Sequence, residues 1–135
     1  MNIPQKHEPI VILNTLSIVA PSGDRIRSGA KTIEVRRWPL DPVPFRDLLI
    51  VQNQKFLTDD SPFDPIAHAV ALVDVLTIRP WEPTDLTRSC ATSFEAGWLA
   101  WELGHVRPVD YPIVLPARRR IYQLDLDPDF LKISG

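Results

Sequence analysis

Apolar and polar residues alternate over short stretches along much of the chain, and this pattern predicts a β-rich fold. Residues 10–19 and 68–78 are rich in β-branched side chains, and residues 47–52 contain the continuous apolar run Leu-Leu-Ile-Val. Such stretches are typical of strands. Two more strands are expected at residues 109–115 and 120–126. The chain also carries 14 prolines spread along its length, which favours short elements joined by rigid loops.

A short helix is predicted over residues 22–28. Asp24 lies near its start, and Gly29 follows its last residue as a stop signal. A second helical turn is expected at residues 84–87. Together with the strands, these segments predict a mainly β protein with short helices, in the α+β class.

Residues 31–38 alternate in character and are predicted to form a strand directly after this helix. Successive side chains of a strand point to opposite faces. Lys31 is therefore expected on one face of the strand, and Glu34, Arg36 and Trp38 on the other.

The pattern predicts about five to seven strands in total. Short strands separated by turn signals at nearly regular spacing favour a barrel or a sandwich. The chain has 135 residues, with no internal repeat and no linker, and this length is typical of one domain. We expect a flexible N-terminal segment at residues 1–9, one domain at residues 10–126 and a C-terminal tail at residues 127–135.

Composition and charge narrow the classes of function. The formal net charge is -2, which is too small for a protein that coats DNA or membranes by its overall charge. The single cysteine, Cys90, excludes an internal disulfide and fits a reducing compartment. The apolar run at residues 10–20 is too short and too polar for a signal peptide or a membrane span. We therefore expect a cytoplasmic protein that does not bind membranes.

Metal and cofactor chemistry finds no support in the sequence. The three histidines, His7, His68 and His105, lie far apart and lack the spacing of metal ligands. We expect neither a metal nor a cofactor.

The candidate chemistry lies in the segment that runs from Ser28 to Trp38. Glu34 and Arg36 share one face of the predicted strand, about 7 Å apart, so that a carboxylate and a guanidinium can orient one another. The rigid donor fork of arginine suits a phosphate group or the edge of a base. The alternative is an ordinary ion pair on a solvated strand, worth about 0–1 kcal/mol.

The motif in this segment resembles the signature of ASCH (activating signal cointegrator homology) domains. The pattern is Gly-x-Lys-x-x-Glu-x-Arg, with Gly29, Lys31, Glu34 and Arg36 in its fixed positions. Three further stretches are similar to the family, in the same order along the chain: VRRWPLDPVPFRDLLIVQN, AVALVDVLTIRPWEPTD and GWLAWELGHVRPVDYPIVLP. The resemblance covers residues 10–126.

The resemblance implies a PUA-like β-barrel, closed or partly open, with a cleft beside the motif. It also implies a role with RNA or nucleotides. Some small members of the family look like amidohydrolases that remove an acetyl group from acetylated cytidine, and others have been linked to RNA cleavage. The match makes Gly29, Lys31, Glu34 and Arg36 candidate site residues, and we add Trp38 because it follows the motif on the Glu34 side.

The sequence departs from the family pattern at three places. The deacetylating members have Thr at the position of Glu34, and this puts a hydroxyl nucleophile activated by lysine in doubt. Many members have a Pro-Trp pair after the first strand, whereas here Pro21 is followed by Ser22. The last strand often begins with Gly-Lys, where this chain has Arg118, Arg119 and Arg120.

These observations lead to a first hypothesis and two alternatives. The first is an RNA- or nucleotide-binding domain in which Lys31 and Arg36 contact phosphate or a base edge, Glu34 contacts a base amine and Trp38 stacks. The second is a small hydrolase acting on RNA or a modified nucleoside, with Lys31 and Glu34 as catalytic residues. The third is a protein-interaction scaffold. The sequence does not fix the oligomeric state.

Two features outside the motif stay open at this stage. The basic side chains either converge on one face that suits a phosphate backbone or are spread evenly over the surface. They are Arg25, Arg27, Lys31, Arg36, Arg37, Arg107 and Arg118 to Arg120. The tryptophans Trp81, Trp98 and Trp101 are expected to pack in the core or at its rim, because their neighbours are apolar, and the alternative is that they stack on bases.

Overall fold

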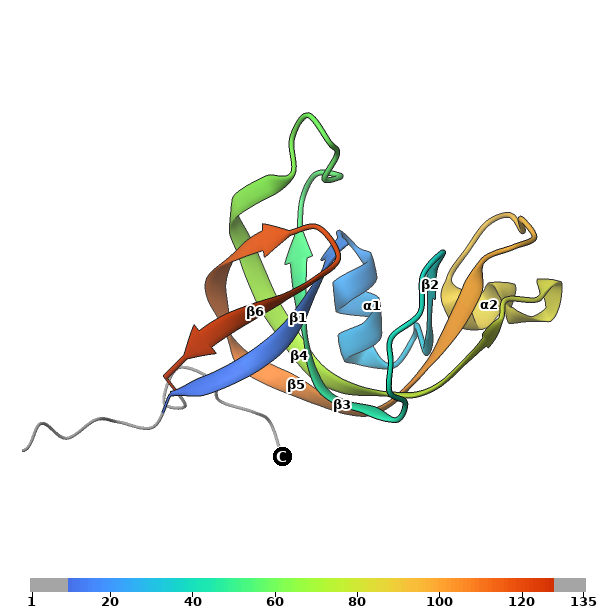
Figure 1. Cartoon of the computed structure of the whole chain (residues 1–135), viewed down its shortest axis with the longest axis horizontal. Coiled ribbons are helices and arrows are strands. Elements are labelled where there is room, and N and C mark those ends of the chain that lie inside the picture. Colours follow the sequence, from blue (N-terminus) through green and yellow to red (C-terminus); the bar gives the residue numbers. More distant parts are fainter. Residues whose placement is uncertain (1–9, 128–135) are drawn as a thin grey trace, which may run out of the picture.

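The computed structural model describes residues 10–127, apart from the side chains of residues 111 and 112. The expectations for residues 1–9 and 128–135 lie outside this part of the chain. The elements in chain order are β1 (Val11–Val19), α1 (Ser22–Ser28), β2 (Ile33–Arg36), β3 (Phe45–Asn53), β4 (Phe63–Pro80), η1 (Pro83–Asp85), α2 (Leu86–Ser89), β5 (Leu99–Arg118) and β6 (Ile121–Leu126). The structure is mainly β with short helices, as predicted (Figure 1).

Six strands form one sheet in the order β2-β5-β4-β3-β1-β6. Strands β1 and β3 are parallel, with Thr15 opposite Leu49, and the other neighbouring pairs are antiparallel. The sheet curls back on itself. As a result, the Ser17 hydroxyl of β1 donates a hydrogen bond to the Arg118 carbonyl of β5 across 2.7 Å. Within residues 10–127 the curled sheet does not close, and β2 and β6 are its edges. A partly open barrel of six strands agrees with the predicted fold class.

Strands β4 and β5 run the length of the molecule and bend as they go (Figure 1). Four register shifts interrupt their pairing, and such bulges increase the local bend and twist of a sheet. The strand predicted at 109–115 is thus the second half of the longer β5. Gly104 lies inside this strand because a Cβ there would sit 2.6 Å from Leu76 Cδ1 of β4.

Helix α1 occupies the predicted residues and packs on β1, β3, β4 and β5. The Gln52 side chain of β3 holds its first turn: Oε1 accepts from the Asp24 backbone N–H at 2.8 Å, and Nε2 donates to the Asp24 carboxylate at 3.0 Å. Gly23 allows this approach, since a Cβ there would lie 2.9 Å from the Gln52 Cβ. The helix ends at Gly29, whose φ of 86° is left-handed and costs glycine little.

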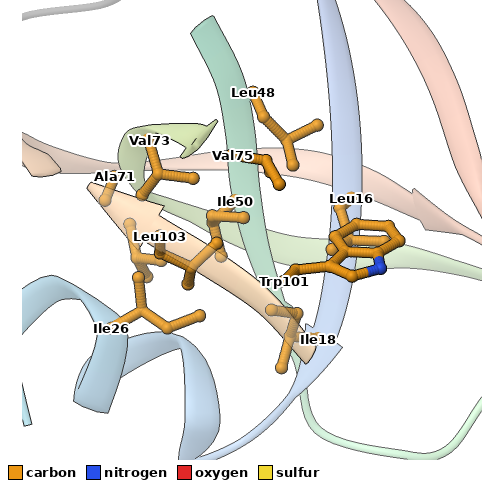
Figure 2. Packing of buried hydrophobic residues seen from close by; sticks show 11 residues of the cluster. Leu16, Ile18, Ile26, Leu48, Ile50, Ala71, Val73, Val75, Trp101 and Leu103 are labelled. Atoms are coloured by element: carbon orange, nitrogen blue, oxygen red, sulfur yellow. The ribbon is translucent and has the colours of Figure 1, made fainter. Parts of the chain in front are cut away.

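The apolar side chains form two main clusters on opposite sides of β3. Leu48 and Ile50 belong to the cluster that also contains Ile26 and Trp101 (Figure 2), whereas Leu49 belongs to the second cluster. From Leu48 onward this strand is therefore buried on both faces, which explains its continuous apolar sequence.

A small third cluster underlies β2, where Ile33, Trp81 and Ala100 are buried. Helix α2 contacts β2 beside this cluster. Edge strand β2 is consequently held from one side by β5 and from the other by α2, and this fixes the motif residues that it carries.

Candidate functional site

The three charged residues of the motif come together at β2. The Lys31 Nζ lies 3.2 Å from Glu34 Oε1, and the Arg36 Nη2 lies 2.8 Å from Glu34 Oε2. Arg36 also donates from Nε to Oε2 at 3.0 Å. The carboxylate thus lies between an ammonium and a guanidinium that grips one of its oxygens with two N–H groups.

The expected separation of Lys31 from Glu34 on opposite strand faces is wrong. Strand β2 begins at Ile33, so Lys31 precedes it and does not follow its alternation. The Lys31 ammonium instead donates to the Ser89 carbonyl at the end of α2, at 2.9 Å. This contact with α2 brings the lysine to the side where Glu34 lies.

Burial makes this ion cluster electrostatically strong. Glu34 is only 5% exposed and Lys31 only 7%. Burial by itself raises the pKa of Glu34, but the adjacent Arg36 and Lys31 outweigh it and hold the pKa of this carboxyl below its ordinary value. Glu34 is therefore an ionised carboxylate at neutral pH.

Arg36 connects the motif to β1. Its Nη2 donates to the Ser17 carbonyl at 3.2 Å as well as to Glu34. Nη1 is left without a hydrogen-bond partner among residues 10–127. The guanidinium is thus fixed in orientation while part of its donor fork stays available.

A hollow of about 350 Å³ lies beside Glu34 and Arg36, within the size range of small-molecule sites. It is lined by Ser17, Ile18, Val19, Ser22, Glu34, Val35, Arg36, Trp38, Asn53, Phe56, Leu57, Trp98, Arg119 and Arg120. Of the five residues predicted for ligand binding, the lining thus contains Glu34, Arg36 and Trp38. Lys31 lies behind Glu34, and Gly29 serves as the end of α1.

Two indole rings line this hollow, and arginines lie over both. The Trp38 ring has the Arg120 guanidinium 4.8 Å and the Arg36 guanidinium 6.0 Å from its centroid, and it makes an edge contact with Trp101 at 5.0 Å. The Trp98 ring has the Arg37 guanidinium at 4.4 Å. These are cation–π distances, and both indoles are only partly buried.

The tight turn between β5 and β6 supplies Arg119 and Arg120 to the hollow. Ser17 fixes this turn through its hydrogen bond to the Arg118 carbonyl. Arg119 forms an exposed ion pair with Asp59 of the loop between β3 and β4. Among the described residues that line the hollow, three arginines therefore face a single acid, Glu34.

Sequence reasoning missed several of these lining residues. Trp81 and Trp101 are buried and Trp98 packs at the rim of the third cluster, as expected, and Trp98 also lines the hollow. The register that places Arg36 opposite Leu99 brings Trp98 to the hollow, and this pairing is not visible in the sequence. The position after Pro21, where the family often has tryptophan, is Ser22, and it also lines the hollow.

The basic side chains converge only in part. Arg36, Arg119 and Arg120 line the hollow. Arg107 instead pairs with Asp74 at 2.7 Å, and Arg27 donates to the Val109 carbonyl at 3.2 Å. The positive charge at the hollow thus comes from some of the basic residues, while Arg27 and Arg107 are engaged elsewhere.

The part of the chain that the structure describes contains neither a candidate metal site nor a helix that could span a membrane. No group of three or more His, Cys, Asp or Glu side chains there could hold a metal ion. No helix within residues 10–127 is long and apolar enough to cross a membrane.

Comparison with known proteins assigns the family of this chain. The family model of the ASCH domain matches residues 16–113. The chain therefore belongs to the ASCH domain family.

Solved structures that are similar to this chain include crystal structures of two mutant proteins of ZmASCH from Zymomonas mobilis, with TM-scores of 0.47 and 0.45 and sequence identities of 19% and 18%. Each similarity covers 74% of this chain, and 72% and 73% of the respective ZmASCH chains. No curated protein matches this chain significantly.

Proposed function

We propose that this ASCH domain binds RNA or a nucleotide in the hollow beside Glu34 and Arg36. The observation that carries the proposal is the lining itself, which combines three guanidiniums with two partly buried indoles around about 350 Å³. Guanidiniums recognise phosphate and base edges, and indoles stack on bases.

In this proposal the Glu34 carboxylate orients Arg36. It holds Nε and Nη2 of the guanidinium, so the fork needs little further ordering when a ligand arrives. Ordering a flexible arginine would otherwise cost about 0.5–1.5 kcal/mol on binding. Arg36 then offers its remaining donor to a phosphate oxygen or a base acceptor.

Trp38 and Trp98 are the proposed stacking platforms. They replace the aromatic residue that the family often carries after the first strand, where this chain has Ser22. Stacking of a base on an aromatic side chain is worth about 1–3 kcal/mol, so either ring would contribute substantially to affinity.

Binding is better supported than hydrolysis. A general base works best when its pKa lies near the operating pH, whereas the pKa of Glu34 is lowered by Arg36 and Lys31. The Lys31 ammonium lies behind Glu34 and donates to Ser89. Both residues predicted as catalytic are thus engaged with each other, and the contact with Lys31 helps to hold Glu34 in its charged form.

The test is a titration of a labelled short single-stranded RNA with wild-type protein and with Arg36→Lys, read by fluorescence anisotropy. The lysine keeps the charge but loses the fork, and we expect affinity to fall about tenfold or more. Arg46→Lys is the matched control, because Arg46 is 70% exposed and pairs with Asp74 away from the hollow. Binding should also weaken as salt rises.

Two results would contradict the proposal. One is undetectable RNA and nucleotide binding at low salt, and the other is an equal effect of the two arginine substitutions. Mass spectrometry of the same RNA and of acetylated cytidine after incubation gives an independent readout, since product formation would favour the hydrolase alternative.

A further inference from the structure

A second, shallower hollow lies next to the first. It measures about 450 Å³ and is lined by Pro62, Phe63, Arg118 and Arg119. Arg119 also lines the first hollow, so the two hollows meet at the turn between β5 and β6. A ligand that leaves the first hollow on this side reaches the second at that arginine.

The second hollow repeats the chemistry of the first. Phe63 is 43% exposed, and the Arg118 guanidinium lies 5.5 Å from its ring centroid. Proteins that bind single-stranded nucleic acids stack a base on an exposed aromatic ring and contact the backbone with a nearby positive charge. Phe63 lies opposite Arg118 in the pairing of β4 with β5, so the ring and the arginine are fixed by the sheet.

We propose that the second hollow binds the neighbouring nucleotide of a single strand, so that the preferred ligand is an oligonucleotide and not a free nucleotide. This inference rests on the proposed function of the first hollow. One base stacks among Trp38 and Trp98, the next packs against Phe63 and Arg118, and the phosphate between them lies at Arg119.

The position of Arg119 suits that role. Its partner in the structure is Asp59, whose side chain is 92% exposed. Exposed ion pairs contribute about 0–1 kcal/mol, so a phosphate can replace this carboxylate at little cost. The hydrogen bond from Ser17 to the Arg118 carbonyl holds the turn in place at 2.7 Å, and therefore sets the spacing of the two hollows.

The experiment compares a mononucleotide, the corresponding dinucleotide and a short single-stranded RNA by calorimetric titration. We expect wild-type protein to bind the dinucleotide at least about tenfold more tightly than the mononucleotide, as one added stacked base predicts. Phe63→Ala should remove most of this gain and leave the affinity for the mononucleotide unchanged. Arg118→Gln should act in the same direction without removing the ring.

Ile66→Ala is the control, because Ile66 is an exposed apolar residue of the same strand that lines neither hollow. Thermal unfolding of each variant identifies any loss of fold. Equal affinity for mononucleotide and dinucleotide, or a Phe63→Ala protein that keeps the full gain, would overturn the inference and leave the proposed function standing. If the wild-type protein binds none of the three ligands, both proposals fail.

Discussion

The Arg36 guanidinium donates to the Ser17 carbonyl across 3.2 Å and so joins β2 to β1. These strands are separated by β5, β4 and β3 in the order of the sheet. Ser17 uses its hydroxyl to fix the turn that carries Arg119 and Arg120, so one buried residue of β1 positions the arginines on both sides of the first hollow.

The ion cluster behind the hollow should matter for stability. Lys31→Met removes the ammonium and keeps an apolar stem, which leaves the buried Glu34 carboxylate with Arg36 alone. Breaking a buried ion pair at one partner typically costs about 3–5 kcal/mol, and because Arg36 remains we expect a loss at the lower end, about 3 kcal/mol. Urea unfolding measures it.

Lys55→Met serves as the control for this substitution, since Lys55 is exposed and the hydrogen bond of its ammonium within residues 10–127 is to the Ser61 hydroxyl. It should change the free energy of unfolding by less than about 0.5 kcal/mol. Adding Glu34→Gln to Lys31→Met should recover part of the loss, because it removes the unbalanced charge. A loss below about 1 kcal/mol for Lys31→Met would show that the pair does not stabilise the fold. The large expected loss also means that Lys31 cannot be tested for catalysis without measuring folding.

The sequence predicted the local features of this molecule well. The β-branched runs predicted the strands, and Gly29 predicted the end of α1. The spacing of two residues between Glu34 and Arg36 predicted that these side chains pair on one strand face. These features depend on neighbours in the chain. The side of β2 on which the Lys31 ammonium lies depends instead on the Ser89 carbonyl of α2, and this side was predicted wrongly.

Most of the other residues that line the hollow could not be predicted, for the same reason. Ser17 meets the Arg118 carbonyl across 101 positions of sequence, and Trp98 reaches the hollow through the register of β2 with β5. Such contacts follow from the order of the strands in the sheet, which periodicity does not reveal. The family resemblance implied a cleft beside the motif, but not which side chains complete it.

Acid should destabilise the protein through its paired carboxyls. The hydrogen bonds from Arg79 lower the pKa of Asp85 from 3.8 to about 2, and the pKa of Glu34 also lies below its ordinary value of 4.5. A carboxyl whose pKa is lower in the folded state stabilises the fold fully above its unfolded pKa, and this stabilisation is lost as the pH falls. We expect the free energy of unfolding to decline below about pH 4.5 and to continue down to about pH 2.

Asp85→Asn separates the contribution of Asp85 to acid sensitivity from that of Glu34. The variant should be less stable at neutral pH, because it lacks the ion pair with Arg79 at 2.8 Å, and it should lose less stability between pH 3.8 and about 2 than the wild type does. Asp60→Asn, in an exposed loop, is the control. Urea unfolding curves at a series of pH values make the measurement, and parallel pH profiles for wild type and Asp85→Asn would contradict the assignment.

Freeing Arg119 should tighten RNA binding. Asp59→Asn removes the carboxylate that occupies this guanidinium, and an exposed pair of this kind is worth up to about 1 kcal/mol. We expect affinity for short RNA to rise by up to about fivefold. Asp60→Asn removes the same charge from the adjacent position, so it measures the general effect of one less negative charge. Equal gains in the two variants at low salt would show that Asp59 does not compete for Arg119.

The Arg120 backbone should reveal a conflict between stability and binding. Its φ of 60° is left-handed, a conformation that costs a residue with a Cβ about 1–2 kcal/mol and costs glycine little. The side chain nevertheless reaches the Trp38 ring.

Arg120→Ala and Arg120→Gly both remove the guanidinium, so both should weaken RNA binding. Only the glycine variant also relieves the backbone strain, and we expect it to be about 1 kcal/mol more stable than the alanine variant. Thermal unfolding and anisotropy titrations of the two proteins provide the comparison. Equal stabilities would mean that the turn is unstrained, and unchanged affinities would mean that Arg120 does not contact the ligand.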